Sequence, residues 1–178
     1  LSQMMVFHES ENSVDIPDNV VFDCDGVPLC HTMFDGNLVL NLELDSKCVG
    51  WEARYTNEII DLGSQNNDPN LFFRSIEGPL SSLTLEKDKF YVLATKEFIR
   101  IPVTHSGEMI PFSHYIGEFR AHYAGFFDPG FGDPSGNTAV LEIRSHDTIT
   151  MFDSQPIALM RFFKNSRFFE RSYGKSVN

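Results

Sequence analysis

The chain has 178 residues, of which 42% are hydrophobic and 22% are charged, and its formal net charge is −11. This length and hydrophobic content are enough for one domain, or for one domain with a fragment of another, and they exclude a chain that is disordered throughout. The acidic balance argues against a nucleic-acid polymer or an anionic membrane as partner, because both would repel the protein. Seventeen Phe and five Tyr favour β structure with packed aromatic cores.

The cysteines Cys24, Cys30 and Cys48 are odd in number and show no C-x-x-C spacing. This usage favours free thiols in a reducing compartment over a disulfide framework or a zinc knot. No apolar run reaches the length of a membrane span, and Leu1 does not begin a signal peptide. We therefore expect a cytoplasmic protein.

The first seven residues, LSQMMVF, align without gaps on IALMRFF at Ile157 to Phe163. This similarity is expected if the chain begins in the last strand of an earlier copy of the same fold. A first residue that is Leu rather than Met is also expected of a fragment. The following segment is acidic and turn-rich, and leaves open a short helix or strand near Val20 to Phe22. We predict a closing strand plus linker at residues 1–32 and one domain at residues 33–178.

Short alternating segments predict strands through the rest of the chain. The first is LVLNLELD, where the leucines at 38, 40, 42 and 44 would face a core and the residues between them solvent. The SQNNDPN run is predicted as a loop, Lys87–Asp88 as a turn, and Glu108–Ile116 as a strand or a short helix. Further predicted strands are Glu52–Tyr55, Ser82–Leu85, Phe90–Thr95, Glu97–Ile101, Thr138–Arg144, Thr148–Phe152 and Ile157–Phe163. With almost no helical periodicity, this spacing predicts an all-β sandwich or small barrel.

The stretch AGFFDPGFGDPSGNTAVLE, Ala124 to Glu142, contains a Gly/Asp/Pro-rich turn and then a strand. Alternation places Ala139, Leu141 and Ile143 on one face of that strand. Val140, Glu142 and Arg144 fall on the other face. A rigid loop that presents one carboxylate beside its own tip can build a small-molecule site. Spacing alone favours a simpler interpretation, in which the loop is an ordinary turn between two strands and Glu142 is a solvent-exposed strand residue.

The strings AGFFDPGFG, AVLEI and SQPIALMRFF resemble the centre of the dCTP deaminase/dUTPase family. Upstream, LTLEKDKFYVLATKEFIRIP and NLVLNLEL are similar to further segments of that family, so the resemblance spans Asn37 to Phe163. It implies an all-β, dUTPase-like distorted jelly-roll barrel of the β-clip type, with sites between the subunits of a trimeric or pseudotrimeric assembly. Together with the N-terminal similarity, it suggests the C-terminal half of a tandem two-barrel dCTP deaminase.

Hydrolytic deamination of cytosine needs an attacking water and a group that moves protons to the ring and to the leaving ammonia. The zinc-dependent pattern H-x-E…P-C-x-x-C does not occur here. A single well-placed carboxylate can do the proton transfers instead. The family resemblance places this catalytic role at Glu142, with dCTP as substrate, Mg²⁺ bound through the triphosphate and no zinc.

The resemblance also implies residues that surround the nucleotide. Those around the deoxyribose and base would be Ala124, Phe127, Asp128, Gly130, Phe131 and Val140, and Tyr173 and Lys175 match the family tail that closes over the nucleotide. For Asp128, capping of its own turn is an equal alternative. The basic residues after Arg161 could hold a triphosphate or only solubilise the terminus. The histidines show no ligand-like spacing, and Trp51 is interpreted as a packing residue.

One family feature is missing. The phosphate-gripping segment R-S-S-x-x-R should fall on Ile110 to Tyr115, which has the sequence IPFSHY. In a tandem protein with sites between barrels, the missing side chains could come from the other barrel half. Two alternatives stay open: a dUTP diphosphatase or bifunctional deaminase that releases dUMP, and a non-catalytic scaffolding or regulatory half-domain.

Overall fold

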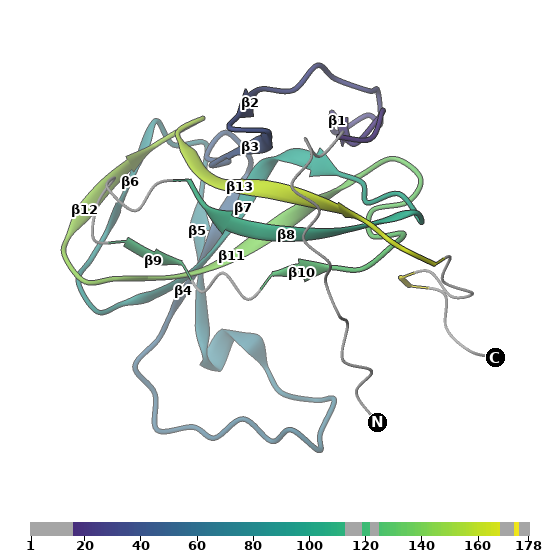
Figure 1. Cartoon of the computed structure of the whole chain (residues 1–178). Coiled ribbons are helices and arrows are strands. Elements are labelled where there is room, and N and C mark those ends of the chain that lie inside the picture. The colour runs from purple at the N-terminus through teal and green to yellow at the C-terminus, as the bar shows by residue number, and fades with distance from the viewer. Residues whose placement is uncertain (1–15, 113–118, 122–124, 168–172, 175–178) are drawn as a thin grey trace.

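The computed structural model describes residues 16–112, 119–121, 125–167 and 173–174. Their longer strands form two antiparallel sheets that face each other across one core (Figure 1). The first sheet has the order β5-β4-β7-β11-β9, with β1 also paired to β7, and the second has the order β10-β8-β13-β3-β2. Strands β6 and β12 form a separate pair. This arrangement confirms the prediction of an all-β fold.

The strands of the first sheet are β1 (Val21–Phe22), β4 (Cys48–Ala53), β5 (Phe73–Glu77), β7 (Phe90–Ile99), β9 (Phe119–Ala121) and β11 (Asn137–Ser145). Those of the second are β2 (Met33–Phe34), β3 (Asn37–Asn41), β8 (His105–Pro111), β10 (Phe126–Phe127) and β13 (Pro156–Lys164). The small pair consists of β6 (Ser82–Leu85) and β12 (Ile149–Phe152). The single helical turn among the described residues is the 3₁₀ turn η1 (Pro69–Leu71). None of the described helical structure has the length and apolarity needed to span a membrane.

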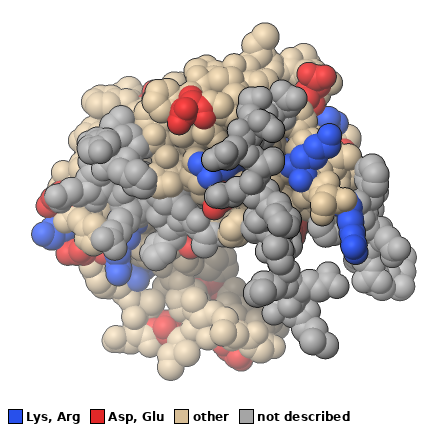
Figure 2. All heavy atoms as spheres, in the orientation of Figure 1, with Lys and Arg blue, Asp and Glu red and all other residues tan. Residues whose placement is uncertain are grey.

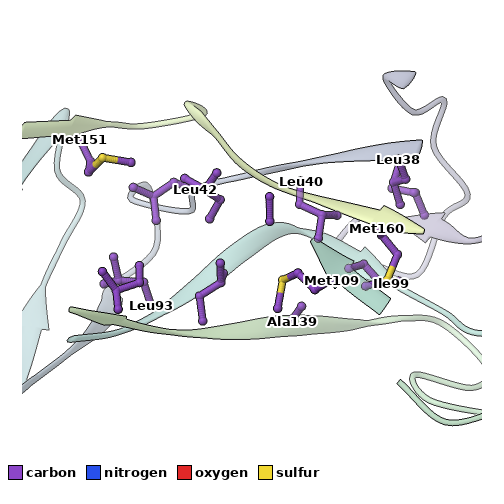
Figure 3. Close-up of a cluster of buried hydrophobic side chains, with 14 of the residues drawn as sticks. Leu38, Leu40, Leu42, Leu93, Ile99, Met109, Ala139, Met151 and Met160 are labelled. Carbon is purple, nitrogen blue, oxygen red and sulfur yellow. The ribbon is translucent and has the colours of Figure 1, made fainter. Parts of the chain in front are cut away.

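The core lies between the two sheets and is built mainly from aliphatic and methionine side chains (Figure 3), together with the aromatic rings of Tyr91 and Phe162. On β11 the predicted alternation is confirmed, since Ala139, Leu141 and Ile143 are at most 1% exposed while the residues between them face outward. Opposing side chains in this core include Leu38 and Leu40 of β3, Leu93 and Ile99 of β7, Met109 of β8 and Met160 of β13. The side chains of β11 that do not enter the core therefore lie on the outward face of the first sheet.

Several predicted strand boundaries were wrong. The two strands expected on either side of Lys96 are one strand, β7. The pairing of β7 with β11 is irregular just after Thr138, and a hydrogen bond to Thr95 joins the two strands at that point. The Thr95 hydroxyl accepts the N–H of Ala139 at 3.0 Å and donates to Glu97 O at 3.0 Å. The segment Glu108–Ile116 is a strand, but one that starts earlier, at His105, and ends at Pro111.

The first leucine-rich strand is also different from the prediction. β3 ends at Asn41, and Val39 is only 5% exposed, so the strand is buried on both faces rather than half-buried. Leu42 and Leu44 are fully buried in the extended chain after the strand, where Gln155 O and the Asp153 carboxylate accept their N–H groups. One backbone acceptor and one side-chain acceptor thus hold the chain in the core after β3 ends.

Part of the predicted linker packs into this domain. Val20 and Val21 belong to the hydrophobic core, and β1 pairs with the end of β7. The boundary at residue 33 stays a prediction, and the strand predicted at Leu1–Phe7 lies outside the described residues. The barrel core nevertheless includes side chains from before residue 33.

Candidate functional site

The loop from Phe126 to Gly136 is bonded to the end of β7. The N–H of Gly130 donates to Ile101 O at 2.8 Å, and the N–H of Ile101 donates to Phe131 O at 2.9 Å. Gly132 has φ +69°, and a Cβ atom there would lie 2.1 Å from Ile99 O. Glycine is required at this position by both the backbone angle and the close approach of β7. The loop is therefore fixed by backbone contacts.

Aromatic side chains cover this loop. The rings of Phe127 and Phe131 meet edge to face at 4.8 Å, and the ring of Tyr173 lies 5.4 Å from that of Phe131. The Tyr173 N–H also donates to Pro129 O at 2.9 Å. The structure thus brings together four of the residues assigned to nucleotide binding: Phe127, Gly130, Phe131 and Tyr173.

The side chain of Asp128 is exposed at the tip of the same loop. Its backbone carbonyl accepts the Phe131 N–H at 3.0 Å, which closes the turn. Its carboxylate accepts no hydrogen bond from any residue of the described part of the chain. Turn closure by backbone alone leaves this carboxylate available to a ligand.

Glu142 projects from the outward face of β11, between the buried side chains of Leu141 and Ile143. Across the sheet, Glu142 pairs with Val92 of β7, and Val92 pairs with Trp51 of β4. Within the described residues, no hydrogen bond or ion pair engages the Glu142 carboxylate. Paired residues of adjacent strands share a face. The structure therefore places in one row a valine, a tryptophan and a carboxylate that no described residue binds.

Glu142 lies near the middle of β11, away from the end that the loop meets. The loop meets β11 at Asn137, and five residues at about 3.3 Å each put Glu142 ~16 Å farther along. The expectation of a carboxylate beside the tip of its own loop was wrong, because β11 runs extended away from the loop. Val140 is the one other assigned binding residue that shares the outward face with Glu142.

Other carboxylates in the barrel are engaged in structural contacts. Glu97 accepts the backbone N–H of Asn41 at 2.8 Å and its side-chain amide at 2.6 Å. Hydrogen bonding from Lys96 is the largest of the effects that lower the pKa of Asp153 to about 2. Burial raises the pKa of Glu52, but hydrogen bonds from Lys89 and Arg74 outweigh it, so that its pKa is lowered. These three carboxylates hold segments of the barrel together.

The region expected to grip the phosphates is only partly described. Phe112, which occupies the place of a family serine, lies with its ring 5.4 Å from that of Phe34. The remaining residues Ser113 to Tyr115 lie outside the described residues, as do the assigned binding residues Ala124 and Lys175. Figure 2 shows Lys and Arg interspersed with Asp and Glu over the face drawn there. In the described ranges, no group of three His, Cys, Asp or Glu side chains could hold a metal ion.

Sequence reasoning missed the row that contains Trp51. Trp51 was interpreted as a packing residue, yet it is 45% exposed on the outward face of β4. The signal that could have found it is strand register, which pairs Trp51 with Val92 and Val92 with Glu142. This register arises from pairing between strands that are distant in sequence, which no short-range pattern reveals.

These features define a dUTPase-like class of all-β barrel. The crystal structure of 2'-deoxycytidine 5'-triphosphate deaminase from Agrobacterium tumefaciens matches this fold with a TM-score of 0.72 and 27% sequence identity. The match covers 84% of this chain and 44% of that chain, so this chain spans less than half the length of the solved deaminase. The chain belongs to the family of 2'-deoxycytidine 5'-triphosphate deaminase (DCD) C-terminal domains, whose model matches residues 15–178. Comparison with curated proteins gave no match.

Proposed function

We propose that this chain is the Glu142-bearing half of a dCTP deaminase, which converts dCTP and water to dUTP and ammonia. The observation that carries the proposal is the state of Glu142. It occupies the glutamate position of the family motif, faces outward from a rigid strand, and is not engaged by any described residue. A carboxylate in this state can meet a substrate without first breaking a structural contact.

The chemistry assigned to Glu142 is proton transfer. Water attacks C4 of the cytosine ring while Glu142 takes one proton from that water and passes it to the ring nitrogen N3, which gives an adduct with a hydroxyl group on C4. Glu142 then takes the proton of that hydroxyl group and gives it to the amino group, the C4–N bond breaks, and ammonia leaves as the C4 carbonyl forms. Mg²⁺ enters with the substrate, on the triphosphate. Val140 and Val92 around Glu142 offer an apolar surface that helps to exclude bulk water.

The site proposed here is shared between two barrels. In one chain Glu142 lies ~16 Å along β11 from Asn137, where the strand leaves the loop that carries Asp128 and Phe131, and this distance is longer than one pyrimidine ring. The segment Ile110–Phe112 also lacks the serines of the family pattern. A second barrel half or another subunit, in a trimeric or pseudotrimeric assembly, would therefore supply the loop and phosphate contacts that meet Glu142.

A second candidate is a half-domain that scaffolds the assembly without catalysis. Phe112 favours it, because an aromatic ring packed on Phe34 stands where the family has a phosphate-binding serine. The intact loop and the free Glu142 carboxylate oppose it.

Product analysis of the assembled protein, in which this chain is joined by the barrel half or subunit that completes its site, tests the proposal. Incubation with dCTP and Mg²⁺ should yield ammonia and dUTP in equal amounts. Release of pyrophosphate from dUTP would identify the diphosphatase or bifunctional alternative. If neither product forms while the chain still assembles with itself or with a second barrel, the scaffold is correct and the deaminase proposal fails.

A further inference from the structure

We propose that Trp51 is a stacking platform for the pyrimidine ring and orients that ring toward Glu142. The inference rests on the proposed function and deepens it. It starts from the outward-facing row in which Trp51, Val92 and Glu142 occupy three adjacent strands. Neither the family motif nor the DPGF loop includes Trp51.

The spacing of the row suits one planar ring. Adjacent strands are about 4.8 Å apart, so the Cα atoms of Trp51 and Glu142 are separated by roughly 10 Å. The floor between them consists of short side chains, Val92 in the same row and Ala94 in the row beside it. A heterocycle that lies over this floor can stack on the indole at one side while its polar edge faces the carboxylate.

Two contacts hold Trp51 in this orientation. Gly50, just before it, lies so close to β7 that a Cβ atom there would be 2.4 Å from Val92 O, which brings β4 tightly against its neighbour. Glu52, just after it, points to the opposite face and binds Lys89 at 2.8 Å and Arg74 at 2.6 Å. Because successive strand residues alternate faces, anchoring Glu52 keeps the indole directed outward.

The exposure of Trp51 also argues for a ligand. A large aromatic side chain that packs only within its own barrel would be expected to lose most of its surface, whereas Trp51 keeps 45% and Val140 nearby on the same face keeps 53%. The apolar surface and the free carboxylate occur together on this face of the first sheet. This combination of an apolar floor with one polar group is typical of a small-molecule site.

The sequence makes a direct test possible, because Trp51 is the one tryptophan of the chain. The full chain carrying Glu142→Gln, which should bind without turnover, is titrated with dCTP and Mg²⁺ while its tryptophan emission is followed. We expect saturable quenching with the same midpoint that calorimetry gives for binding. In the wild-type chain, Trp51→Leu should raise KM about 10-fold with kcat changed less, and Trp51→Phe should restore most of the affinity.

Tyr55→Leu provides the matched control, since Tyr55 is an aromatic residue 90% exposed on the loop after β4 and lies outside the row. It should leave KM unchanged. If calorimetry shows dCTP binding while the tryptophan emission stays constant, the stacking inference is overturned and the proposed function stands. If neither dCTP binding nor turnover occurs, both the stacking inference and the proposed function fail. Emission that changes with protein concentration but not with dCTP would overturn the inference and identify this face as a subunit contact.

Discussion

Two carboxylates on neighbouring strands of one sheet show how differently this barrel uses the same group. Glu97, on β7, accepts two hydrogen bonds from Asn41 and joins the two sheets. Glu142, on β11, faces outward, and no described residue binds it. The difference teaches that the partners of a carboxylate, more than its exposure, separate a structural group from a candidate catalytic one.

The same contrast extends along β11 itself. At its start, the loop is fixed by glycines and backbone hydrogen bonds against β7. At Glu142, the strand offers a side chain with no such contact. A rigid backbone at the start of β11 and, farther along it, a carboxylate that no described residue binds are what a site shared between barrels requires, since each part can meet a different partner. The predictions below test the two sides of this comparison in order of expected effect.

The inward and outward faces of β11 should respond differently to truncation. Leu141→Ala removes a side chain that is 1% exposed, so we expect a loss of about 2–5 kcal/mol in the free energy of unfolding from lost burial and a residual cavity. Val140→Ala, one residue earlier on the exposed face, should change it by less than about 0.5 kcal/mol. Urea denaturation of both variants provides the measurement. Equal losses would show that the outward face is packed within the chain.

The fixed end of the strand can be tested at glycine. Gly132→Ala combines φ +69° with a Cβ position 2.1 Å from Ile99 O, and we expect destabilisation of about 2 kcal/mol or more. Gly36→Ala is the matched control, because its φ of +71° is similar but nothing lies within 4 Å of its added Cβ. The control should lose only about 1 kcal/mol. If both variants unfold at the same urea concentration, the loop is not held against β7.

The structural carboxylates should also give the barrel a pH dependence. The pKa of Asp153 is lowered from 3.8 to about 2, chiefly by the Lys96 hydrogen bond. A lowered folded-state pKa means that this contact stabilises the fold fully above about pH 4 and that the stabilisation is lost as the pH falls toward 2. Asp153→Asn should cost about 1–2 kcal/mol at neutral pH and remove part of the acid sensitivity. Thermal unfolding at several pH values measures this, and an unchanged acid profile in the variant would refute the assignment.

The smallest effect is expected at the aromatic cover of the loop. Tyr173→Ala removes the ring that lies 5.4 Å from Phe131, but the Tyr173 N–H to Pro129 O bond is made by backbone and can persist. We expect a loss of less than about 1 kcal/mol in stability, together with a higher KM for dCTP. Steady-state kinetics alongside urea denaturation separates the two effects. A large loss of stability with unchanged KM would make Tyr173 a structural residue only.

The sequence predicts the strands whose side chains alternate cleanly and misses those whose burial depends on register. β6 was predicted at its observed bounds, Ser82–Leu85, and the faces of β11 followed from its alternation. β5 was missed because its FRSIE sequence is exposed or half-buried throughout. Lys96 was predicted to separate two strands that are in fact one, β7, since the Thr95 hydroxyl contact that keeps that strand continuous is not a local signal.

The candidate site was accessible from sequence only in part. The motif identified Glu142 and the aromatic loop, but the extended strand that separates them, and the register that aligns Glu142 with Trp51, arise from tertiary pairing. Likewise, nothing in the local sequence shows that Val20 and Val21 fill the core.

The central claim is that the Glu142 carboxylate moves the protons of dCTP deamination, and the rate of ammonia release by Glu142→Gln tests it most directly. The account predicts that this variant releases ammonia at least ~100-fold more slowly than wild type, as expected for loss of a general acid–base group, while its affinity for dCTP and its unfolding free energy stay the same. Glu97→Gln, the matched carboxylate, should instead lower stability and leave the rate per folded molecule unchanged. Ammonia release by Glu142→Gln at the wild-type rate would contradict the account.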